Sequence, residues 1–297
     1  MPANKIDTRA IGLDTGLALA RWLTGKEHLH YGLWTGLDVT AGNIGLAQDA
    51  YSARLFALLP QRANLRILDI GGGAGETAEK LIALGHRVEI VVPSAYLAGR
   101  CRVNAPQAVV HECFFENLHS DGGFDLCLFS ESFQYIPLAV SLAKARSLLV
   151  AGGEILIGDC FRSENFHADP TYYTVGGGHR IAAFRQTVAA QPLAIVAEQD
   201  ITAAVAPSID LEQGLFNVLG IGLAGFNREV AAKFPIKHRL LHGVLRLLIS
   251  GRKRARLSQR LFEQARTSQA FVANNCYLLI RLTTDLPLLD LPPKTGT

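Results

Sequence analysis

One short stretch constrains this chain more than any other, and it reads Ile67-Leu68-Asp69-Ile70-Gly71-Gly72-Gly73-Ala74-Gly75-Glu76. The apolar run that ends at Ile70 predicts a buried strand, and residues 77–84 predict a helix. Glycines between the two let the backbone approach a ligand without a Cβ in the way. The N–H groups at the start of the helix attract an anionic or polar group. The stretch therefore predicts a tight strand-to-helix turn, either one that holds a ligand or one that only reverses the chain.

The chain beyond this turn alternates strand patterns with helix patterns, which predicts an α/β fold with a parallel sheet and right-handed crossovers. Ligands bind such sheets outside the carboxyl ends of the strands. The useful residues are therefore expected just after each strand. The expected strands are 65–70, 87–92, 108–111, 124–130, 154–159, 193–197 and 276–282.

The spacing Asp-x-Gly-x-Gly-x-Gly at the end of the first strand resembles motif I of class I S-adenosylmethionine-dependent methyltransferases. The resemblance implies a doubly wound sheet of seven strands and S-adenosylmethionine as the cofactor. The amino-acid end of the cofactor would be held by Asp69, Gly71, Gly72, Gly73 and Gly75. Gly73-x-Gly75-x-x-Ala78 also fits a dinucleotide fingerprint. That alternative ranks second, because its first glycine comes four residues after Asp69.

A segment rich in histidine and aromatic residues precedes the turn, between Lys26 and Trp34. It resembles the N-terminal arm of methyltransferases of the cyclopropane-fatty-acid-synthase and tocopherol-methyltransferase type, which closes over the cofactor. By that resemblance Tyr31 faces the cofactor, and His28 or His30 faces the substrate. The alternative is plain aromatic packing of an N-terminal arm.

The segment after the fourth strand reads Ser130-Glu131-Ser132-Phe133-Gln134-Tyr135. It resembles the part of small-molecule methyltransferases that faces the transferred methyl group. Ser130 would then lie near the cofactor, and Glu131, Gln134 and Tyr135 near the substrate. Burial would raise the pKa of Glu131 and suit it to act as a general base. The alternative is a solvated loop acid.

Two acids that are usual in this family are missing. The second strand ends in Val92-Pro93-Ser94, so Val92 stands where a carboxylate would hold the ribose, and Glu89 comes three residues too early. After the third strand, Phe114 stands where an acid often meets the adenine. Phe114 or Phe115 would still be able to stack on adenine. The loss of the ribose acid also disfavours the nicotinamide alternative.

The chain after the fifth strand is harder to interpret. A loop with Tyr172 and Tyr173 ends near His179, and these three side chains are expected on the substrate side. A long helical insertion is expected before the last strand, as a lid over the substrate mouth. The expected divisions are an N-terminal helical arm (1–62), a cofactor-binding core (63–202), a helical lid (203–272), and the last strand with a tail (273–297).

Charge and cysteine content narrow the class of protein. The net charge of +3 is too small for a nucleic-acid binder. Nine lysines and arginines nevertheless lie between residues 233 and 260, without an Asp or Glu. This stretch predicts either a lid packed on the core with a solvated basic rim, or contact with an anionic membrane surface or acidic partner. Five scattered cysteines, with no metal-ligand spacing, favour a reducing cytoplasm and no metal.

These observations predict methyl transfer from S-adenosylmethionine to an oxygen, nitrogen or carbon atom of a hydrophobic small molecule. The lost acids keep two alternatives open: a non-catalytic methyltransferase-like binding subunit, and an enzyme that uses the same fold and cofactor for other chemistry. The sequence does not predict the oligomeric state.

Overall fold

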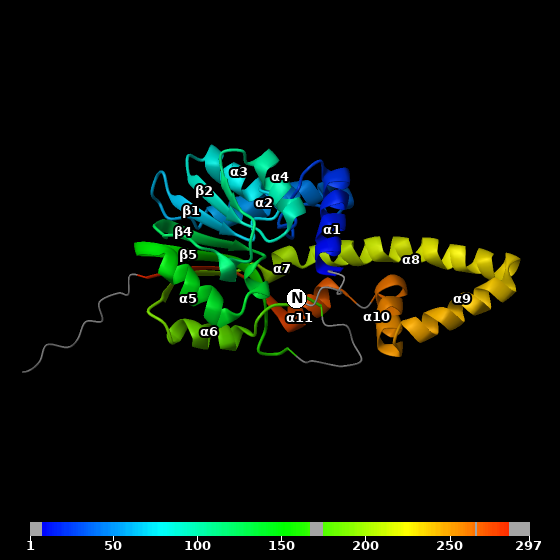
Figure 1. Ribbon diagram of the computed structural model, residues 1–297. Helices are drawn as coiled ribbons and strands as arrows, with labels where there is room; N and C mark the ends of the chain where they lie inside the picture. The colour runs from blue at the N-terminus through cyan, green and yellow to red at the C-terminus, as the bar shows by residue number, and fades with distance from the viewer. Residues whose placement is uncertain (1–7, 167–174, 265, 285–297) are drawn as a thin grey trace, which may run out of the picture.

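The computed structural model describes residues 8–166, 175–264 and 266–284. Its centre is a seven-stranded sheet in the order β3-β2-β1-β4-β5-β7-β6 (Figure 1). All neighbouring strands are parallel except β7, which runs antiparallel to β5 and β6. The strands are β1 Arg66–Ile70, β2 Arg87–Val91, β3 Val109–His111, β4 Phe124–Ser130, β5 Leu149–Arg162, β6 Ala194–Asp200 and β7 Asn275–Thr283. The expected sheet of seven strands is confirmed.

Helices cover both faces of the sheet because its central strands are apolar on both sides. One face packs against α2 (Ile44–Phe56), α3 (Glu76–Ala83) and α4 (Ala95–Asn104). The other packs against α5 (Leu138–Leu148) and α6 (Ile181–Ala189). Side chains of β1 alternate between these layers: Ile67 belongs to the first and Leu68 to the second.

The N-terminal part begins with α1 (Thr8–Thr24). Residues 25–40, called the arm from here on, have no regular structure and lead to the short 3-10 helix η1 (Ala41–Asn43) and to α2. The arm is anchored at Trp34, whose backbone N–H donates to Ala204 and whose indole N–H donates to the Ser208 hydroxyl at 2.8 Å. The arm therefore links the N-terminal helices to the segment that follows β6.

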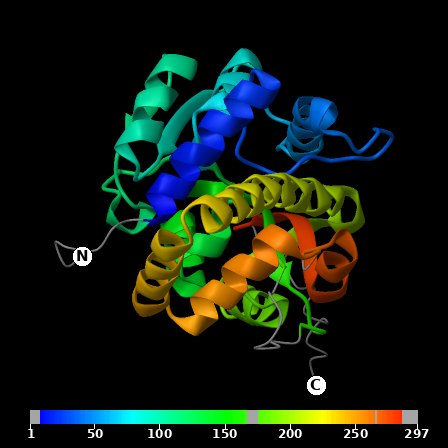
Figure 2. The same ribbon diagram turned by 90° about the vertical axis from the view of Figure 1, so that its right-hand side faces the viewer.

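The helical insertion between β6 and β7 is present as expected. Its helices are α7 Thr202–Val205, α8 Pro207–Lys233, α9 Pro235–Leu248, α10 Gly251–Phe262 and α11 Ser268–Asn274. Only α7, the first turns of α8, and α11 contribute buried apolar side chains to the core. The rest of α8, with α9 and α10, extends away from the sheet beside α1 (Figures 1 and 2). The outer helices thus differ from a lid packed on the core.

The bounds of β5 differ from the sequence expectation. β5 extends from Leu149 to Arg162 instead of 154–159, because Leu149 pairs with Phe124 of β4 at its start and Arg162 pairs with Asn275 of β7 at its end. The five cysteines are all free thiols.

Candidate active site

The glycine turn connects β1 to α3 in three left-handed steps. Gly71, Gly73 and Gly75 have φ angles of 77°, 56° and 92°, a region that favours glycine. A Cβ on Gly71 would overlap the side chain of Ser132, and one on Gly75 would lie 2.9 Å from the Cα of Cys101. The turn can therefore lie close to both the segment after β4 and α4 only because these positions lack side chains.

A cavity of about 840 Å³ opens above this turn. It lies at the carboxyl edge of β1, β2 and β4, where ligands bind in sheets of this topology. The arm forms part of its wall, and Leu29 is the nearest side chain to a Cβ placed on Gly73, at 3.9 Å. Its size is within the range of small-molecule and cofactor sites.

Asp69 is the clearest sign that the cavity is built for a ligand. The carboxylate is buried and lines the cavity, and neither oxygen has a hydrogen-bond partner among the described residues. Burial raises the pKa of Asp69 to about 7. An unpartnered buried carboxylate is costly, so a ligand with N–H donors would remove this cost. The amino group of a bound amino-acid moiety fits this requirement, which supports the sequence assignment of Asp69 and the glycines.

At the end of β2, where a carboxylate usually binds the ribose hydroxyls of the cofactor, this chain has no acid. Val92 lines the cavity at the end of β2 and is buried in the core, while Pro93 and Ser94 follow it along the wall. The Ser94 hydroxyl accepts from the N–H of Leu97 and so caps α4. Glu89 cannot substitute, because Arg66 and His111 hold its carboxylate at 2.7 and 2.8 Å. The cavity therefore fits S-adenosylmethionine at its amino-acid end and lacks the usual contact at its ribose.

The two phenylalanines after β3 have different environments. Phe115 is buried against Phe129 in an edge-to-face contact with ring centroids 5.8 Å apart. Phe114 is about half exposed, and both residues line the cavity. Phe114 is thus the ring with freedom to stack on a ligand, and Phe115 forms the floor beneath it.

Glu131 is the most constrained polar side chain in the cavity wall. Its backbone is left-handed (φ 54°), which is unusual for a residue with a side chain. Its carboxylate Oε1 accepts from the N–H of Tyr31 at 2.7 Å and from the hydroxyl of Tyr277 at 2.8 Å. Burial raises the pKa of Glu131 to about 8, although both of these hydrogen bonds lower it. The carboxyl group therefore gains or loses a proton near neutral pH.

Tyr277 continues the hydrogen-bonded group behind Glu131. Its hydroxyl lies 2.9 Å from the Tyr51 hydroxyl, which in turn lies 3.4 Å from the Ser130 hydroxyl and from the carbonyl of Gly158. A Cβ on Gly158 would lie 2.5 Å from the Tyr51 hydroxyl, so this glycine makes room for the contact. Sequence reasoning missed Tyr51 and Tyr277 as site residues because each reads as an apolar core position.

Gln134 points away from the cavity. Its side-chain amide donates to Asp159 Oδ1 at 2.9 Å, and its backbone N–H donates to Oδ2 at 3.0 Å. His179 packs edge-to-face on Phe133, and its Nε2 lies 2.9 Å from the carbonyl of Ile136. These groups hold the segment after β4 in place rather than line the cavity.

Tyr135 is exposed and lines the rim of the cavity, whereas Tyr172 and Tyr173 lie outside the described residues.

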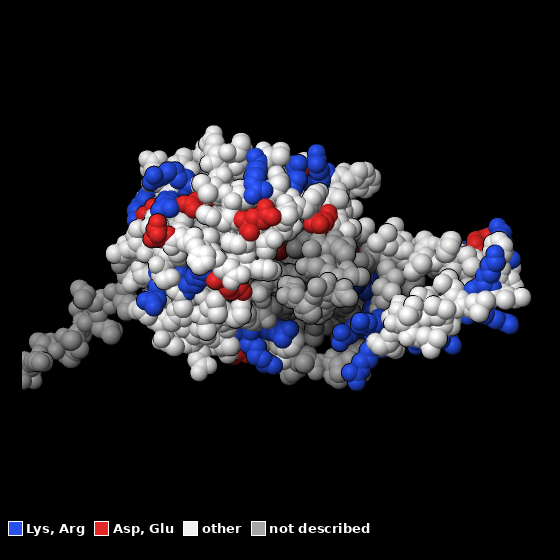
Figure 3. Space-filling model, viewed as in Figure 1, with Lys and Arg blue, Asp and Glu red and all other residues white. Residues whose placement is uncertain are grey.

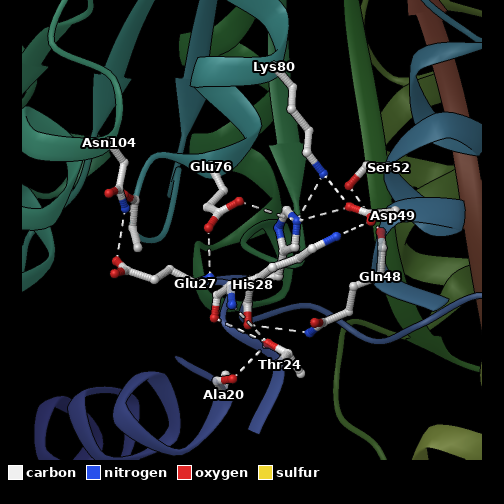
Figure 4. Close-up of polar contacts among 12 residues, drawn as sticks. Ala20, Thr24, Glu27, His28, Gln48, Asp49, Ser52, Glu76, Lys80 and Asn104 are labelled. Carbon is white, nitrogen blue, oxygen red and sulfur yellow. Dashed lines mark hydrogen bonds and ion pairs between the residues drawn. The ribbon is translucent and has the colours of Figure 1, made fainter. Parts of the chain in front are cut away.

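His28 lies at the centre of a polar cluster that fastens the arm to α2 and α3 (Figure 4). Lys80 lies 2.9 Å from His28 Nε2 and 2.8 Å from Asp49 Oδ1. Glu76 accepts from the backbone N–H of Glu27 at 2.7 Å. Burial is the main reason that the pKa of His28 falls to about 3. The ring is therefore neutral, with Nε2 occupied by the Lys80 ammonium, although it lines the cavity.

His30 lines the cavity, as expected from the sequence, whereas Tyr31 does not line it. His30 Nδ1 lies 2.9 Å from the carbonyl of Tyr31, and burial lowers the pKa of His30 to about 4. The ring of Tyr31 packs against Phe271 and Tyr277, with centroids 6.3 Å from each. Tyr31 donates its backbone N–H to Glu131 and packs its ring against Phe271 and Tyr277 instead of lining the cavity.

Comparison with known families agrees with this geometry. Residues 68–157 match the family model described as a methyltransferase domain. This stretch is a methyltransferase domain, and the seven-stranded sheet that contains it has the class I methyltransferase fold. S-Adenosylmethionine, the cofactor expected from the sequence, is thereby confirmed as the cofactor of this domain family. No curated protein matches the chain.

Three solved structures illustrate how far the fold extends beyond this domain. The [4+2]-cyclase SpnF superposes with a TM-score of 0.62 at 13% identity, over 94% of this chain and 95% of its own. A geranyl diphosphate C-methyltransferase from Streptomyces coelicolor A3(2), in complex with S-adenosyl-L-homocysteine, gives 0.60 at 16% identity, over 90% and 92%. The cyclopropane synthase MmaA2 from Mycobacterium tuberculosis gives 0.60 at 15%, over 88% and 91%. At these identities the likeness shows the fold alone.

Val92→Asp tests whether the ribose of the cofactor lies in the usual place. If it does, the new carboxylate meets the two ribose hydroxyls with charge-assisted hydrogen bonds, each worth roughly 1.5–3 kcal/mol. We expect S-adenosylhomocysteine to bind about tenfold tighter or better in calorimetric titration. Val88→Asp is the matched control, because Val88 is buried in the same strand but does not line the cavity, so this variant should only lose stability. Weaker binding by Val92→Asp, with an unchanged circular dichroism spectrum, would contradict the assumed pose.

Proposed function

We propose that this protein transfers the methyl group of S-adenosylmethionine to an oxygen, nitrogen or carbon atom of a hydrophobic small molecule. The observation that carries the proposal is the position of Glu131 in the wall of the cavity that also contains Asp69 and the glycine turn. Support also comes from the methyltransferase domain at 68–157.

The residues of this chain have separable roles in such a reaction. Asp69 and the glycine turn would hold the amino-acid end of the cofactor, which when bound supplies an electrophilic methyl group. Phe114 and Phe115 would contact its adenine. Binding both reactants in one cavity aligns the acceptor with the methyl group, which can account for much of the rate.

Glu131 is the candidate proton acceptor. Its Oε1 is held by Tyr31 and Tyr277, so the carboxyl group is fixed while its proton equilibrates near neutral pH. In the deprotonated state it would take the proton that the acceptor atom loses on methylation. Tyr277 and the backbone of Tyr31 position this carboxylate and do not themselves contact the acceptor.

Label transfer tests the proposal. The purified protein is first examined by native mass spectrometry for bound S-adenosylmethionine, S-adenosylhomocysteine or another ligand. It is then incubated with S-adenosylmethionine carrying a trideuterated methyl group and with fractionated lipophilic extracts. A new trideuteromethylated product supports methyl transfer. Turnover of an extract component without label incorporation would refute it in favour of non-methylating chemistry.

Non-methylating chemistry is the second candidate function. The observation that favours it is the absence of both cofactor-binding acids, with Val92 and Phe114 in their places. The cyclase SpnF has the same fold, so the fold is compatible with more than one reaction. In that case the cavity would bind the cofactor weakly or in another pose, and Glu131 would act on a substrate that accepts no methyl group. A methyltransferase-like binding subunit would show neither label incorporation nor turnover.

A further inference from the structure

The outer helices of the insertion form a ridge that stands away from the body. It consists of the second half of α8, all of α9 and all of α10, residues 220–262 (Figure 1). No residue of α9 or α10 is buried. Neither helix therefore owes its place to packing in the core, and the ridge leaves most of its surface open to contact.

The contacts of α9 direct its polar face inward and its apolar face outward. His238 and His242 lie 3.0 and 2.9 Å from the side-chain oxygen of Asn227 on α8. On the other side Ile236, Leu240, Leu247 and Leu248 are 74%, 65%, 88% and 77% exposed. These four recur at helical spacing and make one apolar stripe. A helix that packs its histidines inward and exposes its leucines is not arranged as an ordinary surface helix.

The charge on the ridge has a single sign over its outer part. Residues 233–260 contain nine lysines and arginines and no Asp or Glu. Three of these bases have internal partners: Lys233 pairs with Glu229 at 3.0 Å, Arg260 pairs with Glu212 at 2.8 Å, and Arg254 donates to the carbonyls of Arg246 and Ile249. Arg252, Lys253 and Arg256 are exposed and share one side of α10. Figure 3 shows mainly blue groups on the ridge, with a red group near its tip, whereas red and blue groups are mixed over the body.

We propose that this ridge, residues 220–262, docks on an anionic lipid surface. The apolar stripe of α9 would enter the boundary of the acyl region, and the bases of α9 and α10 would contact acidic headgroups. A second copy of the chain fits poorly, because a two-fold interface would place the same nine bases against each other. No helix among the described residues is long and apolar enough to cross a membrane, so the contact would be peripheral.

Vesicle sedimentation of the full chain tests the docking directly and does not depend on methyl transfer. The probes are phosphatidylcholine vesicles with and without phosphatidylglycerol, each at low and at high salt. We expect binding to the anionic vesicles at low salt, weaker binding at high salt, and little binding to the neutral vesicles. Absence of binding to anionic vesicles at low salt would overturn the proposal.

Two sets of variants separate the electrostatic and apolar parts. Arg252→Glu with Lys253→Glu and Arg256→Glu should lower the vesicle partition coefficient by about two orders of magnitude. The matched control reverses the same number of exposed charges on the body, Arg54→Glu with Arg87→Glu and Arg146→Glu, and should bind nearly as the parent does. An equal loss of vesicle binding in the two triple variants would mean that overall charge, not the ridge, governs binding, and would overturn the proposal.

The apolar stripe is tested by Leu240→Ser with Leu247→Ser and Leu248→Ser. This variant keeps every base, so we expect it to bind anionic vesicles at low salt and to dissociate fully at high salt, where the parent retains part of its binding. Sedimentation velocity on the same proteins tests self-association. A dimer of the parent that these three substitutions dissociate, together with unchanged vesicle binding by the same variant, would assign the stripe to a second copy and overturn the proposal.

Discussion

Replacing Glu131 by glutamine is expected to lower the rate of methyl transfer by about 10²–10⁴-fold. Glutamine can present its amide oxygen to the N–H of Tyr31 and the hydroxyl of Tyr277, so both hydrogen bonds to Oε1 remain. It cannot accept a proton. The measurement is the single-turnover rate with the acceptor that label transfer identifies, together with calorimetric titration of S-adenosylhomocysteine, whose affinity should not change. An unaltered rate would exclude Glu131 as the base.

The pH dependence of the methyl-transfer rate in the unsubstituted protein shows which protonation state of Glu131 is active. Burial raises the pKa of Glu131 to about 8. Because only the deprotonated carboxylate accepts a proton, the rate should rise with pH through about 8 and level off above it. In Glu131→Gln this rise should disappear. A rate that falls over the same range would show that the protonated form is the active one.

Tyr277→Phe is the control that distinguishes a catalytic carboxylate from a structural one. The Tyr277 hydroxyl lowers the pKa of Glu131 by donating to it, although burial keeps that pKa raised. Removing the hydroxyl should therefore move the rise in rate to higher pH while leaving the rate at high pH largely intact. A lower rate at every pH, with the rise at the same pH as in the parent, would indicate that Tyr277 only supports the fold.

Gly73→Val is expected to weaken S-adenosylhomocysteine binding on the order of a hundredfold. Gly73 lines the cavity, and a Cβ there meets nothing closer than the Leu29 side chain at 3.9 Å. The branched side chain would therefore project into the space that the amino-acid end of the ligand needs. Binding is measured by calorimetry and unfolding by chemical denaturation.

The left-handed backbone at Gly73 requires a control of its own. Valine at φ 56° is strained, at a cost on the order of 1–3 kcal/mol of stability, whatever the ligand does. Gly85 follows α3 at φ 88°, with no atom within 4 Å of an added Cβ, and it does not line the cavity. Gly85→Val should thus lose a similar amount of stability and bind the ligand normally. Equal loss of affinity in both variants would mean that strain, and not the cavity, explains the result.

Sequence alone determined those features in which neighbours in the chain are also neighbours in space. The turn between β1 and α3 is local, so its glycine spacing predicted the fold class and the strand-to-helix turn that is observed. The assignment of a cofactor to this turn stays a prediction. The apolar periods of the strands predicted all seven, and the helical insertion expected before the last strand is present. Strand ends were less accurate, because the length of β5 depends on its pairing with β4 and β7.

The tertiary structure decided which polar side chains share the cavity. Glu131 is held by Tyr31 and Tyr277, which are 100 and 146 residues away, and no local pattern encodes that contact. Gln134 and His179 come from the expected segments but face Asp159 and backbone carbonyls instead of the cavity. The outward direction of the apolar face of α9 likewise depends on Asn227 of α8. Periodicity shows that a helix has two faces, but only the packing of its neighbours determines which face is covered.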